Sequence, residues 1–223
     1  MKIEKLEIAT ADIKKQLHFY RDLLGLEIRD QKEKSFEIVI ESSILKFRQD
    51  KNFTPYHIAI HIADKQEEKA LAWLKTRVSI LKNGKDEIVD FSAWDAKSIY
   101  FYDEDKNIME FISRKNFNKP VSEVFSEKSL LGIAEIGLAT NDIEEKFIFL
   151  HQQYELEIFD GNFEKFCAIG DHQGLFITIN KNLKDWFPTG DKTFSSDFRI
   201  NFNHKGIDHK LEFINDCLKL AKK

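Results

Sequence analysis

An internal repeat is the feature that most constrains how this chain can fold. Shifting the 223-residue sequence by 130 positions lays residues 5–13 (KLEIATADI) on residues 135–143 (EIGLATNDI) without a gap. Eleven positions between residues 3 and 36 are then identical, where chance gives about two. In first-copy numbering they are Ile3, Ala9, Thr10, Asp12, Ile13, Phe19, Leu26, Glu27, Ile28, Asp30 and Phe36. A fainter copy appears at a shift of 52, so one small unit is used several times.

Each copy carries the same local pattern. Residues 2–10 alternate apolar and polar side chains, which predicts a half-buried strand. Asp12 is placed to cap a helix over residues 13–24, and Gly25 suits the end of that helix. An extended run over residues 26–30 and strands over 35–41 and 43–48 complete the unit. The predicted unit is βαβββ.

Three more units follow the first. The second starts at His57, has Asp64 as its helix cap and ends with strands near 97–102 and 108–114. The third spans residues 131 to about 180. The fourth offers a strand over 198–202 and an amphipathic helix over 207–220, which leaves it without its last three strands. We therefore predict two domains, residues 1–114 and residues 131–223 (incomplete), joined by a polar linker over residues 115–130.

Charge and cysteine content restrict the class of protein. Lys and Arg number 34 against 38 Asp and Glu, giving a net charge of −4 with both signs interspersed, which disfavours a nucleic-acid partner. No uncharged apolar run approaches the roughly 20 residues of a membrane helix, so no membrane association is expected. Cys167 and Cys217 lack CxxC spacing, which indicates a reducing compartment. The expected location is cytoplasmic.

Two signatures carry a family resemblance. FYRDLLGL (residues 19–26) lies in the first predicted helix, and YFYDEDKNIMEF (residues 100–111) closes the second unit. Together with the repeated units, they resemble the vicinal oxygen chelate superfamily, which includes glyoxalase I, extradiol dioxygenases, fosfomycin-resistance proteins and bleomycin-resistance proteins. The resemblance covers nearly the whole chain. It implies an α+β fold of tandem βαβββ modules with open, curved, mixed sheets, in which the fourth module is truncated.

The resemblance also implies a cleft between two paired units, with a divalent metal held on their opening and closing strands. The family pattern places His or Gln seven residues before the capping Asp, and Glu on the closing strand. The second unit matches with His57 and Glu110. The first unit instead has Lys5 and Lys46 at these positions. The third has Glu135 on its opening strand, with Thr178 or a neighbour on its closing strand.

Lysines in the metal positions favour a degenerate site. Lysine binds a metal only when neutral, which requires a large fall from its ordinary pKa. We therefore predict no cofactor, and a small-molecule-binding protein whose ligand can be anionic. Its cleft is expected in the first domain, formed by Lys5, Lys46, His57, Trp94, Ser98, Tyr100 and Glu110.

Two alternatives remain open. One is a metal-dependent enzyme, a glyoxalase I-like lyase or isomerase or an extradiol dioxygenase-like enzyme, in which His57 and Glu110 hold Fe, Mn, Ni or Zn, with His61 as a neighbour. The other is a structural or interaction protein with decayed clefts, whose lysines form ion pairs with Glu7 or Glu110. The short fourth unit would leave a sheet edge exposed, so we expect the second half to be structural or to form a homodimer, with Glu135 a vestige.

Overall fold

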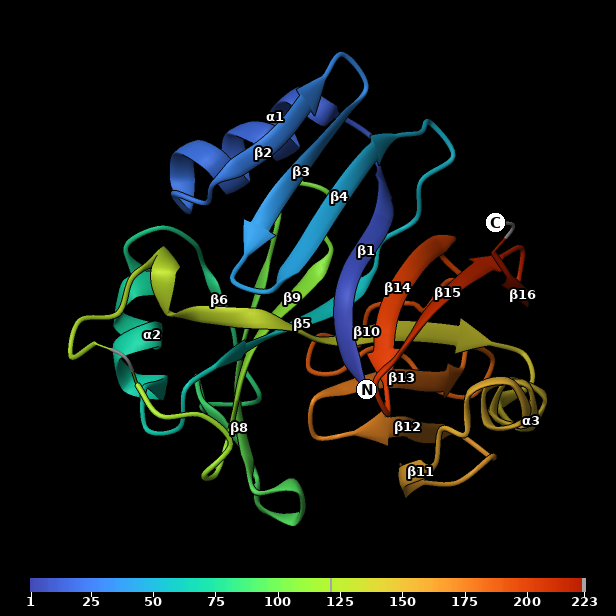
Figure 1. Cartoon of the computed structure of the whole chain (residues 1–223). Helices are drawn as coiled ribbons and strands as arrows, with labels where there is room; N and C mark the ends of the chain where they lie inside the picture. Colours follow the sequence, from blue (N-terminus) through green and yellow to red (C-terminus); the bar gives the residue numbers. More distant parts are fainter. Residues whose placement is uncertain (121, 222–223) are drawn as a thin grey trace.

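The computed structural model describes residues 1–120 and 122–221, which form four modules (Figure 1). Module 1 contains β1 (Lys2–Thr10), α1 (Ile13–His18) continued by a π-helical turn (Phe19–Leu23), β2 (Ile28–Lys32), β3 (Ser35–Ile40) and β4 (Ser43–Gln49). Module 2 contains β5 (His57–Ile62), α2 (Glu67–Lys75), β6 (Ile80–Leu81), β7 (Val89–Phe91), β8 (Ala96–Tyr102) and β9 (Ile108–Arg114). Module 3 contains β10 (Leu130–Thr140), α3 (Ile143–Tyr154), β11 (Ile158–Gly161), β12 (Phe166–Asp171) and β13 (Gly174–Asn180). The α+β fold and its repeated modules are confirmed.

The predicted helix caps hold in modules 1 and 3. Asp12 accepts hydrogen bonds from the backbone N–H groups of Lys14 and Lys15, and Asp142 accepts one from Glu145 at 2.9 Å. Asp64 does not cap α2, whose first turn begins at Glu67 after Gln66. Its carboxylate instead accepts from the Asn116 N–H at 3.1 Å, so it fastens the chain that leaves β9.

The helix predicted over residues 207–220 is wrong, because module 4 contains strands there. This module is a meander of three antiparallel strands, β14 (Phe198–His204), β15 (Ile207–Ile214) and β16 (Cys217–Leu220). Leu211 and Phe213 are buried while the residues between and beside them are more exposed, which is a two-residue period. Asn215 and Asp216 both have positive φ, as a tight hairpin turn requires.

The strands join into one sheet through the opening strands of the modules. Within modules 1 to 3 the closing strand runs parallel to the opening strand: β4 beside β1, β9 beside β5 and β13 beside β10. Between modules, β5 pairs with β10 and β1 pairs with β14, both antiparallel. A single register pair, Ile3 with Ile133, connects β1 to β10. In Figure 1 the N-terminus accordingly lies near the centre of the molecule.

This pairing differs from the two predicted domains. The opening strand of module 2 pairs with that of module 3, and the opening strand of module 1 with that of module 4, whereas the sequence pattern paired module 1 with module 2 inside residues 1–114. The segment over residues 115–130 therefore connects two modules that face each other. The correction matters for function because it decides which side chains share a cleft.

Apolar packing lies between each helix and the strands of its own module. Helix α1 packs on β3 and β4, α2 on β8, and α3 on β12 and β13 (Figure 1). Stacked Phe36 and Phe47, with ring centroids 4.9 Å apart, are typical of this core. Within the described residues, no helix combines the length and apolar character needed to cross a membrane.

Candidate metal centre

Three donor side chains from modules 2 and 3 meet between the paired strands. His57 opens β5, Glu110 lies in the middle of β9, and Glu135 lies in β10. The registers that align Ala59 with both Glu110 and Glu135 bring the two carboxylates to the same level of the sheet. His57 Nε2 is 3.3 Å from Glu110 Oε2 and 4.0 Å from Glu135 Oε2. One donor atom from each residue lies within 4.8 Å of the others.

Neighbouring side chains hold each carboxylate by its other oxygen. Ser98 Oγ donates a hydrogen bond to Glu110 Oε1. Arg114 Nη2 donates to Glu135 Oε1 at 2.7 Å. As a result, the two Oε2 atoms are left facing the imidazole. One nitrogen and two carboxylate oxygens, oriented by outer partners, form a donor set that suits a divalent transition metal.

Burial controls the protonation of these three groups, each of which is at most 5% exposed. Burial lowers the pKa of His57 to about 4, so the imidazole is neutral near pH 7 and keeps a lone pair. Burial raises the pKa of Glu110, and the nearby Glu135 charge raises it further. Burial also raises the pKa of Glu135, against the opposing effect of Arg114. Without a cation, the pocket therefore resists holding two negative charges.

An aromatic cavity of about 520 Å³ opens from this group. Its walls include Phe91, Trp94, Tyr100, Phe166, Trp186 and Phe187. The Trp186 ring centroid is 5.2 Å from that of His57. Trp186 fits because Gly137 lies beneath it: a Cβ atom at Gly137 would come within 2.6 Å of the indole. A glycine in the middle of β10 thus makes room for one wall of the cavity.

The structure brings together most of the residues predicted for the cleft. Trp94, Tyr100, His57 and Glu110 line the cavity, and Ser98 holds Glu110 from behind. Trp94 Nε1 also donates to Asp160 Oδ2 at 2.6 Å, which ties module 2 to module 3.

Lys5 and Lys46 do not join them, which corrects the predicted cluster. Lys5 Nζ pairs with Glu37, and Lys46 Nζ lies 2.8 Å from Glu7 Oε2. The physical reason is the strand pairing: β1 lies between β4 and β14, where Glu7 also pairs with Arg199, and not beside β5, which carries His57. The ion pair between Lys46 and Glu7 is the one that the decayed-cleft alternative expected.

The closing strand of module 3 supplies no donor. Glu135 is aligned with Leu175 as His57 is with Ile108, so the position matching Glu110 is Ile177, which lines the cavity. Thr178 is fully buried, and its hydroxyl has no hydrogen-bond partner among the described residues. His61 lies further along β5 and contacts the Gln173 carbonyl at 3.2 Å. It is not part of the donor group.

Three important residues were missed or undervalued in the sequence. Glu135 occupied the repeat position of His57, and that equivalence was the available signal for it. Arg114 lies four residues after Glu110 and therefore on the same strand face, which the two-residue period could have indicated. Trp186 lies in the irregular segment between β13 and β14, where no periodic pattern marks it.

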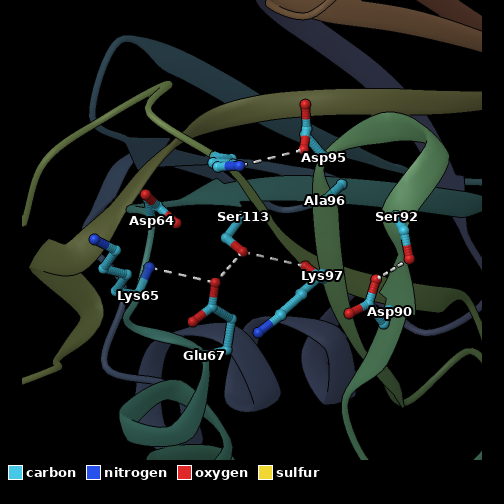
Figure 2. Close-up of a pocket in the computed structure, with 10 residues that line it drawn as sticks. Asp64, Lys65, Glu67, Asp90, Ser92, Asp95, Ala96, Lys97 and Ser113 are labelled. Carbon is cyan, nitrogen blue, oxygen red and sulfur yellow. Dashed lines mark hydrogen bonds and ion pairs between the residues drawn. The ribbon is translucent and has the colours of Figure 1, made fainter.

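A second cavity, of about 330 Å³, lies at the edge of module 2 (Figure 2). Buried Glu67 accepts hydrogen bonds there from Ser113 Oγ and from the Lys65 N–H. Its wall mixes lysines with carboxylates whose donor atoms do not converge. Over residues 1–120 and 122–221, the group of His57, Glu110 and Glu135 is the only set of three such donors that meets.

Comparisons with known proteins find one group of similar sequences and several similar folds. No protein-family model matches the sequence. The metallothiol transferase FosB of Staphylococcus haemolyticus is 30% identical over 115 residues, which cover 48% of this chain and 80% of that protein. FosB of Staphylococcus epidermidis matches with the same identity and coverage.

Solved structures show the same fold at low sequence identity. Glyoxalase I from Zea mays aligns with a TM-score of 0.53 and 14% identity, over 79% of this chain and 66% of the maize chain. A Bacillus subtilis protein provisionally assigned as a dioxygenase aligns with a TM-score of 0.57 and 13% identity, over 80% of this chain and 63% of its own. At these identities the likeness concerns the fold alone.

Proposed function

Because this chain belongs to the vicinal oxygen chelate superfamily, we propose that it is a metal-dependent enzyme whose divalent ion is held by His57, Glu110 and Glu135. The observation that carries the proposal is the orientation of the two carboxylates. Each is held by Oε1 and presents Oε2 to the same buried imidazole nitrogen. This reverses the favoured expectation of a degenerate site and takes up the enzyme alternative.

Charge balance supports a cation here. Two carboxylates and one guanidinium leave a formal charge of −1 in a region from which water is largely excluded. Isolated buried charge is costly unless it is paired or binds a metal. A divalent ion would favour the ionised carboxylates and a neutral imidazole at the same time.

The remaining residues define what the cavity can do. When bound, the ion would act as a Lewis acid on oxygen atoms of a substrate, with three protein donors leaving other coordination positions free. Burial raises the pKa of Tyr100 well above its ordinary value, and the Glu110 charge adds to this, so its hydroxyl stays protonated. Tyr100 can therefore donate a hydrogen bond to a substrate oxygen in the cavity. The aromatic walls exclude water from the bound molecule.

A volume of about 520 Å³ suits a small-molecule substrate. The staphylococcal relatives are named metallothiol transferases, so we propose transfer of a thiol to a small electrophile as the first reaction to test. The aromatic lining favours a partly apolar acceptor.

Metal binding tests the proposal directly. Purified protein, stripped with chelator, would be titrated with Mn²⁺, Fe²⁺, Ni²⁺ and Zn²⁺ by calorimetry. We expect one site per chain, weakened at least about 100-fold in His57→Ala and Glu110→Gln. His61→Ala is the matched control, because it removes a buried histidine of the same strand outside the donor group. Equal binding by all variants, or none by the wild type, would overturn the proposal.

Two observations favour a second candidate function, metal-independent binding of a small molecule. Arg114 already pairs with Glu135, and Ile177 stands where module 3 would offer a fourth donor. This candidate expects no metal in the titration, together with a rise in melting temperature on adding a small-molecule ligand.

A further inference from the structure

Trp186 lines a third cavity in addition to the one at the metal centre. This cavity has a volume of about 410 Å³ and is formed by the chain before β5, the turn between β8 and β9, and the segment between β13 and β14. Aromatic side chains make up much of its wall: Tyr56, Tyr102, Trp186 and Phe194. Planar apolar surfaces of this kind fit an aromatic ring.

Two ammonium groups give the cavity a net positive charge. Lys106 and Lys192 line it, and within the described residues neither lies within 4.0 Å of a carboxylate oxygen. Asp191 is the carboxylate in the lining, and it accepts a hydrogen bond from the Tyr102 hydroxyl. The lysines are therefore available to an acidic group from outside the chain.

The backbone at Lys106 strengthens this interpretation. Lys106 has a φ of 62°, in the left-handed region where a side chain costs about 1 kcal/mol relative to glycine. Its Nζ lies 4.9 Å from the centroid of the Tyr102 ring, at the cavity wall. Glycine would make the same turn without this cost, whereas lysine at this position places an ammonium group at the cavity wall.

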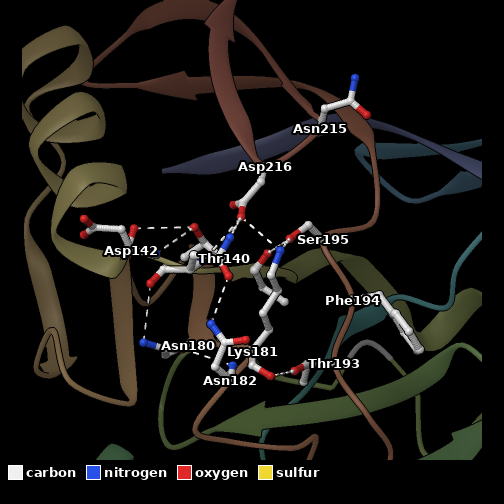
Figure 3. Close-up of polar contacts among 12 residues, drawn as sticks. Thr140, Asp142, Asn180, Lys181, Asn182, Thr193, Phe194, Ser195, Asn215 and Asp216 are labelled. Carbon is white, nitrogen blue, oxygen red and sulfur yellow. Dashed lines mark hydrogen bonds and ion pairs between the residues drawn. The ribbon is translucent and has the colours of Figure 1, made fainter.

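The segment that carries Trp186 is fixed at its base, as Figure 3 shows. Lys181 Nζ contacts Ser195 Oγ at 2.7 Å and Asp216 Oδ2 at 3.0 Å. Ser195 Oγ donates to the Ala139 carbonyl of β10 at 2.7 Å. The backbone N–H of Trp186 donates to the backbone carbonyl of Asp191 at 2.8 Å, which closes the far end of this segment. The cavity wall is therefore formed before any ligand arrives.

We propose that this cavity binds a small aromatic acid, with its ring against Trp186 and Tyr102 and its carboxylate paired with Lys106 and Lys192. The site is separate from the metal donors and does not depend on the proposed function. Since Trp186 also contacts His57, an occupant is positioned to influence the metal cavity through that ring.

The test compares 2-naphthoate with its neutral analogue 2-naphthamide by calorimetry. We expect naphthoate to bind at least about tenfold more tightly, because the amide cannot pair with the lysines. Lys106→Gly and Lys192→Ala should each weaken naphthoate binding about tenfold, while Lys106→Arg retains it. Lys106→Gly should not lower the melting temperature, since glycine suits the backbone there. This separates loss of a ligand contact from loss of fold.

Controls assign the probe to this cavity. Glu110→Gln should leave naphthoate binding unchanged, which distinguishes this site from the metal centre. Lys184→Ala removes a lysine that lines the metal cavity and should also have no effect. Equal affinity for acid and amide, or loss of binding in Lys184→Ala in place of Lys106→Gly, would overturn the proposal, as would failure of naphthoate to bind.

Discussion

At the scale of single residues, Arg114 determines the charge at the centre. It is 2% exposed, pairs with Glu135 through Nη2, and leaves Nε and Nη1 without a hydrogen-bond partner among the described residues. A guanidinium buried in this way provides part of the positive charge that a metal ion would provide. Its removal should therefore make the protein depend on metal for stability.

We predict that Arg114→Met lowers the free energy of unfolding by about 3–5 kcal/mol when metal is absent, because Glu135 is left buried and unpaired. Adding Mn²⁺ or Zn²⁺ should recover most of that loss. Chemical denaturation with chelator and with metal measures both quantities. A variant equally destabilised under both conditions would show that Arg114 acts only in packing.

The pH dependence of metal-free protein follows from the buried carboxyl groups. Glu110 has a folded pKa above its ordinary 4.5, so over this range the folded state binds more protons than the unfolded chain. Stability from this group is thus present at low pH and lost as pH rises through the folded pKa. His57, with its lowered pKa, acts oppositely and costs stability as pH falls below about 6.5.

In chelator, wild-type protein should therefore lose more stability than Glu110→Gln between about pH 5.5 and about pH 8.5. Glutamine keeps the shape and cannot ionise, and His57 is common to both proteins. Melting temperatures of the two proteins at the two pH values give the comparison. Parallel changes in both would contradict a raised pKa at Glu110.

At the scale of elements, local signals predicted what local interactions decide. The alternation of β1 and the capping by Asp12 and Asp142 follow from neighbouring residues, and they were correctly predicted. Residues 207–220 were misassigned because Ile207, Leu211 and Ile214 fit a helical spacing, whereas the buried pair Leu211 and Phe213 follows the two-residue period of a strand. Pairing with β14 selects the strand over the helix, and the sequence of the segment by itself does not specify that partner.

The difference between the Asp142 and Asp64 positions gives a prediction. Asp142→Ala should lower the free energy of unfolding by about 1 kcal/mol, because an N-cap hydrogen bond to α3 is lost. Asp64→Ala should leave the amide protection of α2 unchanged and speed exchange at the Asn116 N–H, since its carboxylate accepts from that group instead. Denaturant unfolding of Asp142→Ala and hydrogen exchange of the whole Asp64→Ala protein test the two statements. Faster exchange confined to the first turn of α2 would contradict the assignment.

At the scale of the whole molecule, the repeat predicted four modules but could not show which pairs form. Every opening strand has a similar pattern, so the partner of β5 is set by contacts across the sheet rather than by local sequence. This is why His57 and Glu110 were recognised while Lys5 and Lys46 were placed with them, and why Glu135 was undervalued. The predicted homodimer stays a prediction.

A division of the chain tests the pairing. Residues 1–114 alone lack Glu135 and the β10 partner of β5, so this fragment should not bind metal with the affinity of the whole chain. Mixing it with residues 115–223 should restore binding, measured by calorimetry. Full metal affinity in the first fragment alone would favour the two-domain arrangement over the one described.

The order of pairing along the chain has a consequence for synthesis. Modules 2 and 3 are neighbours in sequence, whereas Glu7 of β1 meets Arg199 across 192 positions. During synthesis on the ribosome, modules 2 and 3, which carry the three donors, can associate first. Strand β1 pairs with β4 early but gains its second partner, β14, only after most of the chain has been made. The metal centre between modules 2 and 3 is thus assembled early, and modules 1 and 4 pair last.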